Sequence, residues 1–194
     1  MSATSSPSSA AGEPAVTAAD LPGYETGTWT IDPVHSEIAF SVRHLGIANV
    51  RGRFDDFDGE IVLAENPLES SVRAAIRIAS VSTAHDQRDA HIRSEEFLHA
   101  EKYPEMTFRS TGVRRGGRDG FLVDGELTVR GVTRPVTLDL ELNGFGKGYE
   151  GRSVAGFSAT TQLSRKDFGV TGGPTGAALG DTIKITLDVE ASRV

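Results

Sequence analysis

The chain has no cysteine and one tryptophan among its 194 residues, and it contains no uninterrupted apolar run of about 18 residues. The lack of cysteine excludes disulfides, thiolate metal sites and cysteine nucleophiles, and it suits a reducing compartment. The lack of a long apolar run excludes a transmembrane helix. The sequence therefore predicts a soluble protein whose chemistry depends on other side chains.

Positive charge is also scarce. The formal net charge is -7 and the pI is about 5.2, and no stripe of lysine or arginine with interleaved aromatic residues offsets this balance. Such a chain would be repelled by a phosphate backbone. Nucleic acid is therefore excluded as an expected partner.

The N-terminal segment has few large apolar side chains. Residues 1–26 are rich in Ser, Ala, Pro and Thr, and they show neither a basic n-region nor a continuous apolar h-region. This composition predicts a disordered tail over 1–26, one folded domain over 27–194 and a cytoplasmic localisation.

Most of residues 27–194 alternates apolar and polar residues, which is typical of half-buried strands. In EIAFSVRHL, Ile38, Phe40 and Val42 share one face, while Arg43 lies on the other. Turn residues separate the segments of this kind. The further segments are SVRAAIRIASV (71–81), EMTFRS (105–110), GFLVDGELTV (120–129), PVTLDLELNG (135–144) and TIKITLDVE (182–190).

About eight or more short strands, each with one polar face, predict an all-β antiparallel sandwich or barrel. Two segments break the alternation. Residues 84–99 read as a short helical excursion that ends before Pro104, and residues 167–181 are too glycine-rich for regular structure. Long irregular segments in a compact domain are usually functional or disordered.

Motifs for catalysis, metals or nucleotides are missing. The five histidines lack zinc-ligand spacing, and no G-x-S-x-G elbow is present. GFGKGY (144–149) reads as a hairpin turn, because a dinucleotide fingerprint needs a third glycine and a following helix. We therefore predict no catalytic residue, no metal and no cofactor, so that the protein is expected not to be an enzyme.

Two segments are candidates for anion binding. In RDAHIRSEEF, Arg88 and His91 lie three residues apart, so on a helix they would share one face beside Ile92. That face suits a phosphate next to an apolar chain, and it equally suits anchoring of the helix to a barrel rim. SRKDFGV (164–170) favours an ion pair at a strand end over anion binding.

Several motifs in order resemble the YceI-like family of polyisoprenoid-binding proteins. They are TWTIDPVHSEIAFSVRHLGIANVRGRFDDFDGEI (28–61), RDAHIRSEEFLHAEKYPEMTF (88–108), GELTVRGVTRPVTLDLEL (125–142) and SRKDFGV (164–170). The resemblance covers residues from about 27 to the C-terminus. It implies an extended eight-stranded antiparallel lipocalin-like barrel with a helical excursion at about 84–99, whose long apolar pocket holds an isoprenoid or similar lipid. It also implies a homodimer.

On this basis we expect a carrier or storage protein whose partner is an isoprenoid or other long-chain lipid. Arg88 and His91 are the expected contacts to the lipid head group. Two alternatives remain open at this stage, an enzyme acting on a prenyl lipid through His91 or His44, and a ligand-free scaffold with a filled barrel. The expected pocket wall is Phe40, Val42, Phe54, Ile76, Ile78, Phe97, Phe108, Phe121, Leu138 and Leu140.

Overall fold

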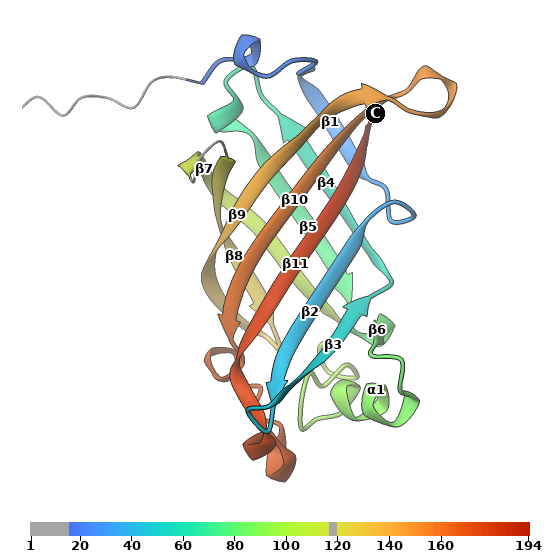
Figure 1. Cartoon of the computed structure of the whole chain (residues 1–194), viewed down its shortest axis with the longest axis vertical. Coiled ribbons are helices and arrows are strands. Elements are labelled where there is room, and N and C mark those ends of the chain that lie inside the picture. The colour runs from blue at the N-terminus through green and yellow to red at the C-terminus, as the bar shows by residue number, and fades with distance from the viewer. Residues whose placement is uncertain (1–15, 117–119) are drawn as a thin grey trace, which may run out of the picture.

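The computed structural model describes residues 16–116 and 120–194. Its main feature is an antiparallel sheet that closes on itself (Figure 1). The strands are β1 (Gly27–Ile31), β2 (Glu37–His44), β3 (Ala48–Phe54), β4 (Phe57–Leu63), β5 (Ser71–Arg77), β6 (Val81–Ser82), β7 (Glu105–Gly116), β8 (Gly120–Val129), β9 (Val132–Lys147), β10 (Ser153–Ser164) and β11 (Leu179–Arg193).

The eleven elements form eight long strands, because three of the long strands are each interrupted and so consist of two elements. β1 and β2 both pair with β11 and so form one interrupted strand. β4 and β3 pair with β1 and β2 respectively, and β5 and β6 pair with β4 and β3. The order continues through β7 to β11 and closes where β1 meets β11. The prediction of an eight-stranded antiparallel barrel is confirmed.

The three interruptions lie side by side in neighbouring strands. They are residues 32–36, Asp55 with Asp56, and the 3-10 helix η3 (Ile78–Ser80). Backbone bonds cross the interruptions, since Asp55 N donates to Ser80 O at 3.3 Å and Arg77 N donates to Asp56 O at 2.9 Å. Beyond them β6 pairs only with β3, whereas β7 pairs with β5 and β8. The barrel wall therefore lacks a strand pairing between β6 and β7.

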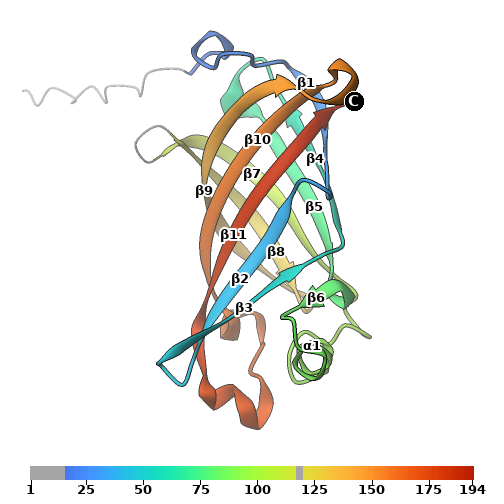
Figure 2. The same ribbon diagram turned by 45° about the vertical axis from the view of Figure 1, so that its right-hand side comes forward.

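Residues 83–104, the covering segment, lie at this gap in the lower part of the barrel (Figure 2). The segment contains α1 (Asp86–Arg93), and turns follow. Ile92 and Leu98 pack against the core between β3, β4 and β5, and Phe97 and Leu98 pack against Val129. The chain leaves its strands here because the gap needs an apolar cover. The helical excursion predicted at 84–99 is confirmed in place, although the helix itself ends at Arg93.

The other end of the barrel is closed by residues 16–26 and by η2 (Pro67–Glu69), both seen at the top of Figure 1. Val16 is buried, and Tyr24 Oη donates to Ala64 O at 2.7 Å. Glu25 forms ion pairs with Lys147 and Arg193. Residues 16–26, which the composition assigned to a disordered tail, therefore pack on the barrel. The rest of that prediction, residues 1–15, lies outside the described residues.

A buried apolar cluster lies beneath this cover. Trp29 is 1% exposed, and it packs with the buried Ala155 and Ala191 and at an angle against the ring of Phe145. This cluster packs beneath the cover without filling the barrel, because the interior cavity is lined as far up as Leu21 and Tyr24. No helix in the described ranges 16–116 and 120–194 is long and apolar enough to cross a bilayer.

Candidate ligand-binding cavity

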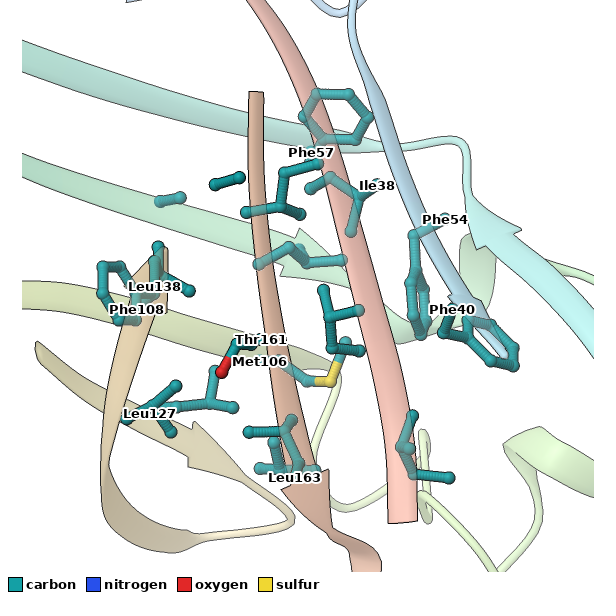
Figure 3. Close-up of a pocket in the computed structure, with 18 of the residues that line it drawn as sticks. Ile38, Phe40, Phe54, Phe57, Met106, Phe108, Leu127, Leu138, Thr161 and Leu163 are labelled. Atoms are coloured by element: carbon teal, nitrogen blue, oxygen red, sulfur yellow. The ribbon is translucent and has the colours of Figure 1, made fainter. Parts of the chain in front are cut away.

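The barrel encloses a cavity of about 1040 Å³. This volume is at the upper end of the range for small-molecule sites, roughly 300–1,000 Å³. Every long strand contributes inward side chains, and Figure 3 shows aliphatic and aromatic groups facing the lumen with Thr161 among them. The cavity runs from Tyr24 at the closed end to Thr175 near α1. A barrel of this kind can hold an elongated apolar molecule.

The structure places the predicted wall residues on this cavity, with one exception. Phe97 reaches it from the covering segment, and the others reach it from the strands. Those that line the cavity are Phe40, Val42, Phe54, Ile76, Phe97, Phe108, Phe121, Leu138 and Leu140.

Ile78 is the exception, and its assignment to the wall is wrong. The strand predicted over 71–81 ends at Arg77, and Ile78 begins η3. Its side chain is 0% exposed and is not among the residues that line the cavity. Ile78 therefore stabilises the wall from within the packed core.

The cavity is lined by further residues that were not among the predicted wall. Some lie on the apolar faces of predicted strands, and others come from segments whose structure the apolar–polar alternation did not predict. Ile183, Ile185 and Leu187 lie on the apolar face of the predicted strand 182–190. Phe57 and Ile61 lie in β4, which the sequence pattern did not indicate because the pair Asp58-Gly59 is typical of a turn but lies within this strand. Others not predicted are Leu21, Tyr24, Ile38, Met106, Leu127, Val136, Leu163 and Phe168.

Basic and imidazole side chains meet the cavity at its lower end, whereas the closed end carries the neutral polar side chains of Tyr24, Ser70 and Ser71. His44, Arg88, His91 and Thr175 line it there, and Arg88 and Thr175 are exposed. Leu45 also lines this end and is 63% exposed. The cavity therefore reaches the surface where the β2–β3 turn, η6 (Gly173–Ala178) and α1 surround the barrel end in Figure 2. We call this end the mouth.

Arg88 both anchors α1 and faces the cavity. Its Nε donates to Thr83 Oγ1 at 2.7 Å, and Nη2 donates to Thr83 O at 2.9 Å. Nη1 has no hydrogen-bond partner in the part of the chain that the structure describes. The guanidinium is thus oriented by Thr83, the residue that follows β6, and Nη1 remains available to a ligand. The two readings of Arg88, anchor and anion contact, are compatible.

His91 is also held in place. Its Nε2 donates to Glu96 Oε2 at 2.6 Å, and its ring meets the edge of Phe97 with centroids 4.9 Å apart. This arrangement places one polar ring beside one apolar ring at the mouth. It suits a ligand whose polar end follows an apolar chain.

Asp89 fixes α1 to Thr83, the first residue of the covering segment. It is 7% exposed and accepts hydrogen bonds from the Thr83 backbone N–H at 2.8 Å and from the Thr83 hydroxyl. Burial acts to raise the pKa of Asp89, but the two bonds from Thr83 outweigh it and the pKa is lowered. Asp89 and Arg88 therefore hold α1 through the same threonine.

Arg165 has a different role from the ion pair that its motif SRKDFGV predicted. Its side chain is 6% exposed and makes no ion pair within the described residues; instead Nε donates to Gly180 O. Its terminal nitrogens donate to four more carbonyls, those of Val170, Thr171, Gly176 and Leu179. The guanidinium thus organises the irregular segment 165–180. Among the described residues Arg165 therefore forms no ion pair of the kind expected for SRKDFGV, because its donors are bound to backbone carbonyls.

The segment around η6 also depends on glycine. A Cβ on Gly176 would lie 1.8 Å from Thr171 O, and Gly172 has a φ of +77°. Neither position accepts a larger residue without a shift of the backbone. Pro174, Thr175 and Ala177 are thereby held on the cavity at the mouth.

One group of potential metal ligands lies away from the cavity. Asp32, His35 and Glu190 place their ligand atoms within 4.8 Å of one another at the first strand interruption. His35 Nδ1 donates to Asp32 Oδ2 at 2.8 Å, and this bond together with Glu190 raises the pKa of His35. Three ligands are one fewer than a tetrahedral structural site uses. The group acts as an ion pair that joins the interrupted strand to β11.

A closed eight-stranded antiparallel barrel with an enclosed apolar cavity defines a lipocalin-like protein. The chain belongs to the YceI-like domain family, whose model matches residues 29–191. A UPF0312 protein of Photorhabdus laumondii is 45% identical over 135 residues, which are 69% of this chain and 70% of that protein.

Two solved structures show the same fold. The YceI protein of Campylobacter jejuni has a TM-score of 0.70 and 33% identity, and the match covers 78% of this chain and 90% of that one. A polyisoprenoid-binding domain from Saccharophagus degradans has a TM-score of 0.68 and 14% identity, with 88% and 100% covered.

Proposed function

We propose that this protein binds a long-chain isoprenoid or similar amphiphilic lipid inside the barrel, as a carrier or storage protein. The observation that supports the proposal most directly is the cavity of about 1040 Å³ with its almost continuous apolar wall. The description of the Saccharophagus degradans domain as polyisoprenoid-binding agrees with it. A filled scaffold barrel is disfavoured, because such a barrel has no internal cavity.

The apolar wall would supply most of the affinity. Each CH₂ moved from water into the cavity gains about 0.8 kcal/mol, whereas an exposed ion pair at the mouth adds only about 0–1 kcal/mol. Long chains are therefore favoured by the interior. The head group at Arg88 and His91 sets orientation and selectivity.

The polarity of the cavity gives the lipid a direction. The closed end is covered by residues 16–26 and η2 and offers only neutral polar groups such as Tyr24 and Ser70, whereas the side chains of His44, Arg88 and His91 gather at the mouth. An amphiphile would therefore enter tail first and leave its head beside α1. The partly exposed imidazole and guanidinium groups suit a hydroxyl or a phosphate.

The test compares a neutral prenol with the prenyl phosphate of the same chain length in a fluorescence displacement assay. We expect both to bind, and Arg88→Gln to weaken only the phosphate, by up to about fivefold. Arg73→Gln is the matched control, because Arg73 is exposed on the outer face of β5 and pairs with Glu60. No binding of either lipid would refute the proposal.

The same samples distinguish a carrier from an enzyme. After incubation, thin-layer chromatography of the prenyl phosphate should show it unchanged. Conversion that His91→Gln or His44→Gln abolishes would instead identify an enzyme acting on prenyl lipids.

A further inference from the structure

The turn between β2 and β3 exposes apolar side chains beside the mouth. Leu45 is 63% exposed and Ile47 is 80% exposed. Leu45 N donates to Ala178 O at 2.7 Å, which joins the turn to the end of η6. Two segments far apart in the sequence thus meet at the same end of the barrel, the lower end in Figure 2.

The backbone of this turn is unusual for an apolar residue. Leu45 has a φ of +51° and Gly46 has a φ of +73°, so both are left-handed. Asn, Asp and Gly are the usual residues at such positions, because a branched side chain there costs conformational free energy. An exposed leucine held in this conformation is an outlier that favours a functional role over a structural one.

The surface is uncharged at its centre. Residues 45–50 contain no charged side chain, and neither do residues 170–180, where Pro174 and Ala177 are exposed. We call these two stretches together the apolar tip. Leu45, Pro174 and Ala177 of the apolar tip also line the mouth, so the apolar tip is continuous with the cavity wall.

Basic side chains border the apolar tip on the outer face of the barrel. Arg51 lies opposite Ser41, which lies opposite Lys184, so both cations sit at one level of the wall. Arg43 is one row nearer the tip. Neither Arg51 nor Lys184 has an ion-pair partner among the residues described, although the whole chain carries a formal charge of -7. Three basic side chains therefore lie beside the apolar tip, while the nearby carboxylates of Glu96 and Asp181 are hydrogen-bonded to His91 and Ser164.

We propose that the apolar tip docks on an anionic phospholipid bilayer, with Leu45 and Ile47 entering the interface and Arg43, Arg51 and Lys184 facing the phosphates. Apolar side chains with a basic border are the combination that binds such surfaces. Docking in this orientation places the mouth against the bilayer, so that a lipid passes between membrane and cavity without crossing water. Only that last step rests on the proposed function.

The test is co-sedimentation with vesicles of phosphatidylcholine alone or mixed with phosphatidylglycerol. We expect binding to the anionic vesicles that salt weakens. Ile47→Ser should reduce it about tenfold or more, and Arg51→Gln should reduce it about fivefold. Neither residue lines the cavity, so lipid uptake from detergent should be unchanged.

The matched control is Tyr149→Ser. Tyr149 is 88% exposed on the β9–β10 connection at the opposite end of the barrel, so its loss should leave vesicle binding unchanged. Thermal melts should show that all variants fold. Failure of the wild type to bind anionic vesicles, or an equal loss in Tyr149→Ser, would overturn the proposal.

Two further measurements separate this proposal from others. If Ile47→Ser changes the oligomeric state in sedimentation velocity but leaves vesicle binding unchanged, the apolar tip is an interface with a second copy of this chain. The membrane proposal is then wrong. A prenol displacement assay without vesicles tests the cavity alone. Prenol binding without vesicle binding overturns docking and leaves the proposed function standing, whereas vesicle binding without prenol uptake supports docking and contradicts the proposed ligand.

Discussion

Replacing Thr161 by phenylalanine should shorten the chain that the barrel accepts. Thr161 lies on β10 and faces the lumen in Figure 3. A phenyl ring there would occupy space in the path between the mouth and the closed end. Because the cavity is not filled, the ring can enter it without displacing the buried cluster around Trp29.

The magnitude follows from the hydrocarbon that the ring displaces. The ring takes the place of about six chain carbons, and each buried CH₂ contributes about 0.8 kcal/mol. A long prenol should therefore lose about 5 kcal/mol, which is roughly three thousandfold in affinity. A short prenol that fits between the mouth and the ring should keep most of its affinity.

The assay is displacement of a fluorescent lipid by prenols of increasing length. In the wild type, affinity should rise with length by roughly fourfold for each CH₂ until the cavity is full. In Thr161→Phe it should stop rising at a shorter chain. Thr160→Phe is the matched control, because Thr160 is the preceding residue and is exposed on the outer face. If affinity depends on chain length in Thr161→Phe as it does in the wild type, or if Thr160→Phe changes this dependence equally, the claim that the lipid chain lies in the lumen is refuted.

Three further predictions concern stability. Arg165→Lys should lower the free energy of unfolding by about 3 kcal/mol or more, because buried carbonyls lose charged donors; a loss below about 1 kcal/mol in urea denaturation would contradict this. Ile78→Ala should cost about 2–5 kcal/mol in the same assay and leave lipid affinity unchanged, and a selective loss of affinity would return Ile78 to the wall. The lowered pKa of Asp89 means that its stabilisation is present above its unfolded pKa of about 3.9 and is lost as pH falls through the lower folded value. Asp89→Asn should therefore flatten the decline in melting temperature below about pH 4, and an unchanged profile would count against the Thr83 contact.

The strand pattern could predict the barrel wall because alternation continues over whole strands. Ile183, Ile185 and Leu187 follow one another on the inner face, as their spacing indicated. The same rule failed at Ile78, because η3 keeps an apolar residue at the expected position while it turns the side chain into the core. Periodicity alone does not report an interruption of this kind.

Long-range contacts account for the features that no motif could predict. Tyr24 contacts Ala64 and Phe145, so its place on the closed end depends on residues far along the chain. Arg165 binds carbonyls as distant as Gly180, whereas the local letters SRKDFG favoured an ion pair. Arg88 and His91 could be placed together from the sequence, because their helical spacing puts them on one face of α1. Their part in head-group binding stays a prediction, as do the cytoplasmic localisation, the homodimer and the lack of metal and nucleic-acid partners.

The most direct test of the central claim is mass spectrometry of an organic extract of the protein purified from its own cells without detergent. The account predicts a prenyl or other long-chain lipid in a ratio close to one per chain, and much less of it in Thr161→Phe. An extract with no such lipid, from protein that also fails to take up prenols in vitro, would contradict it.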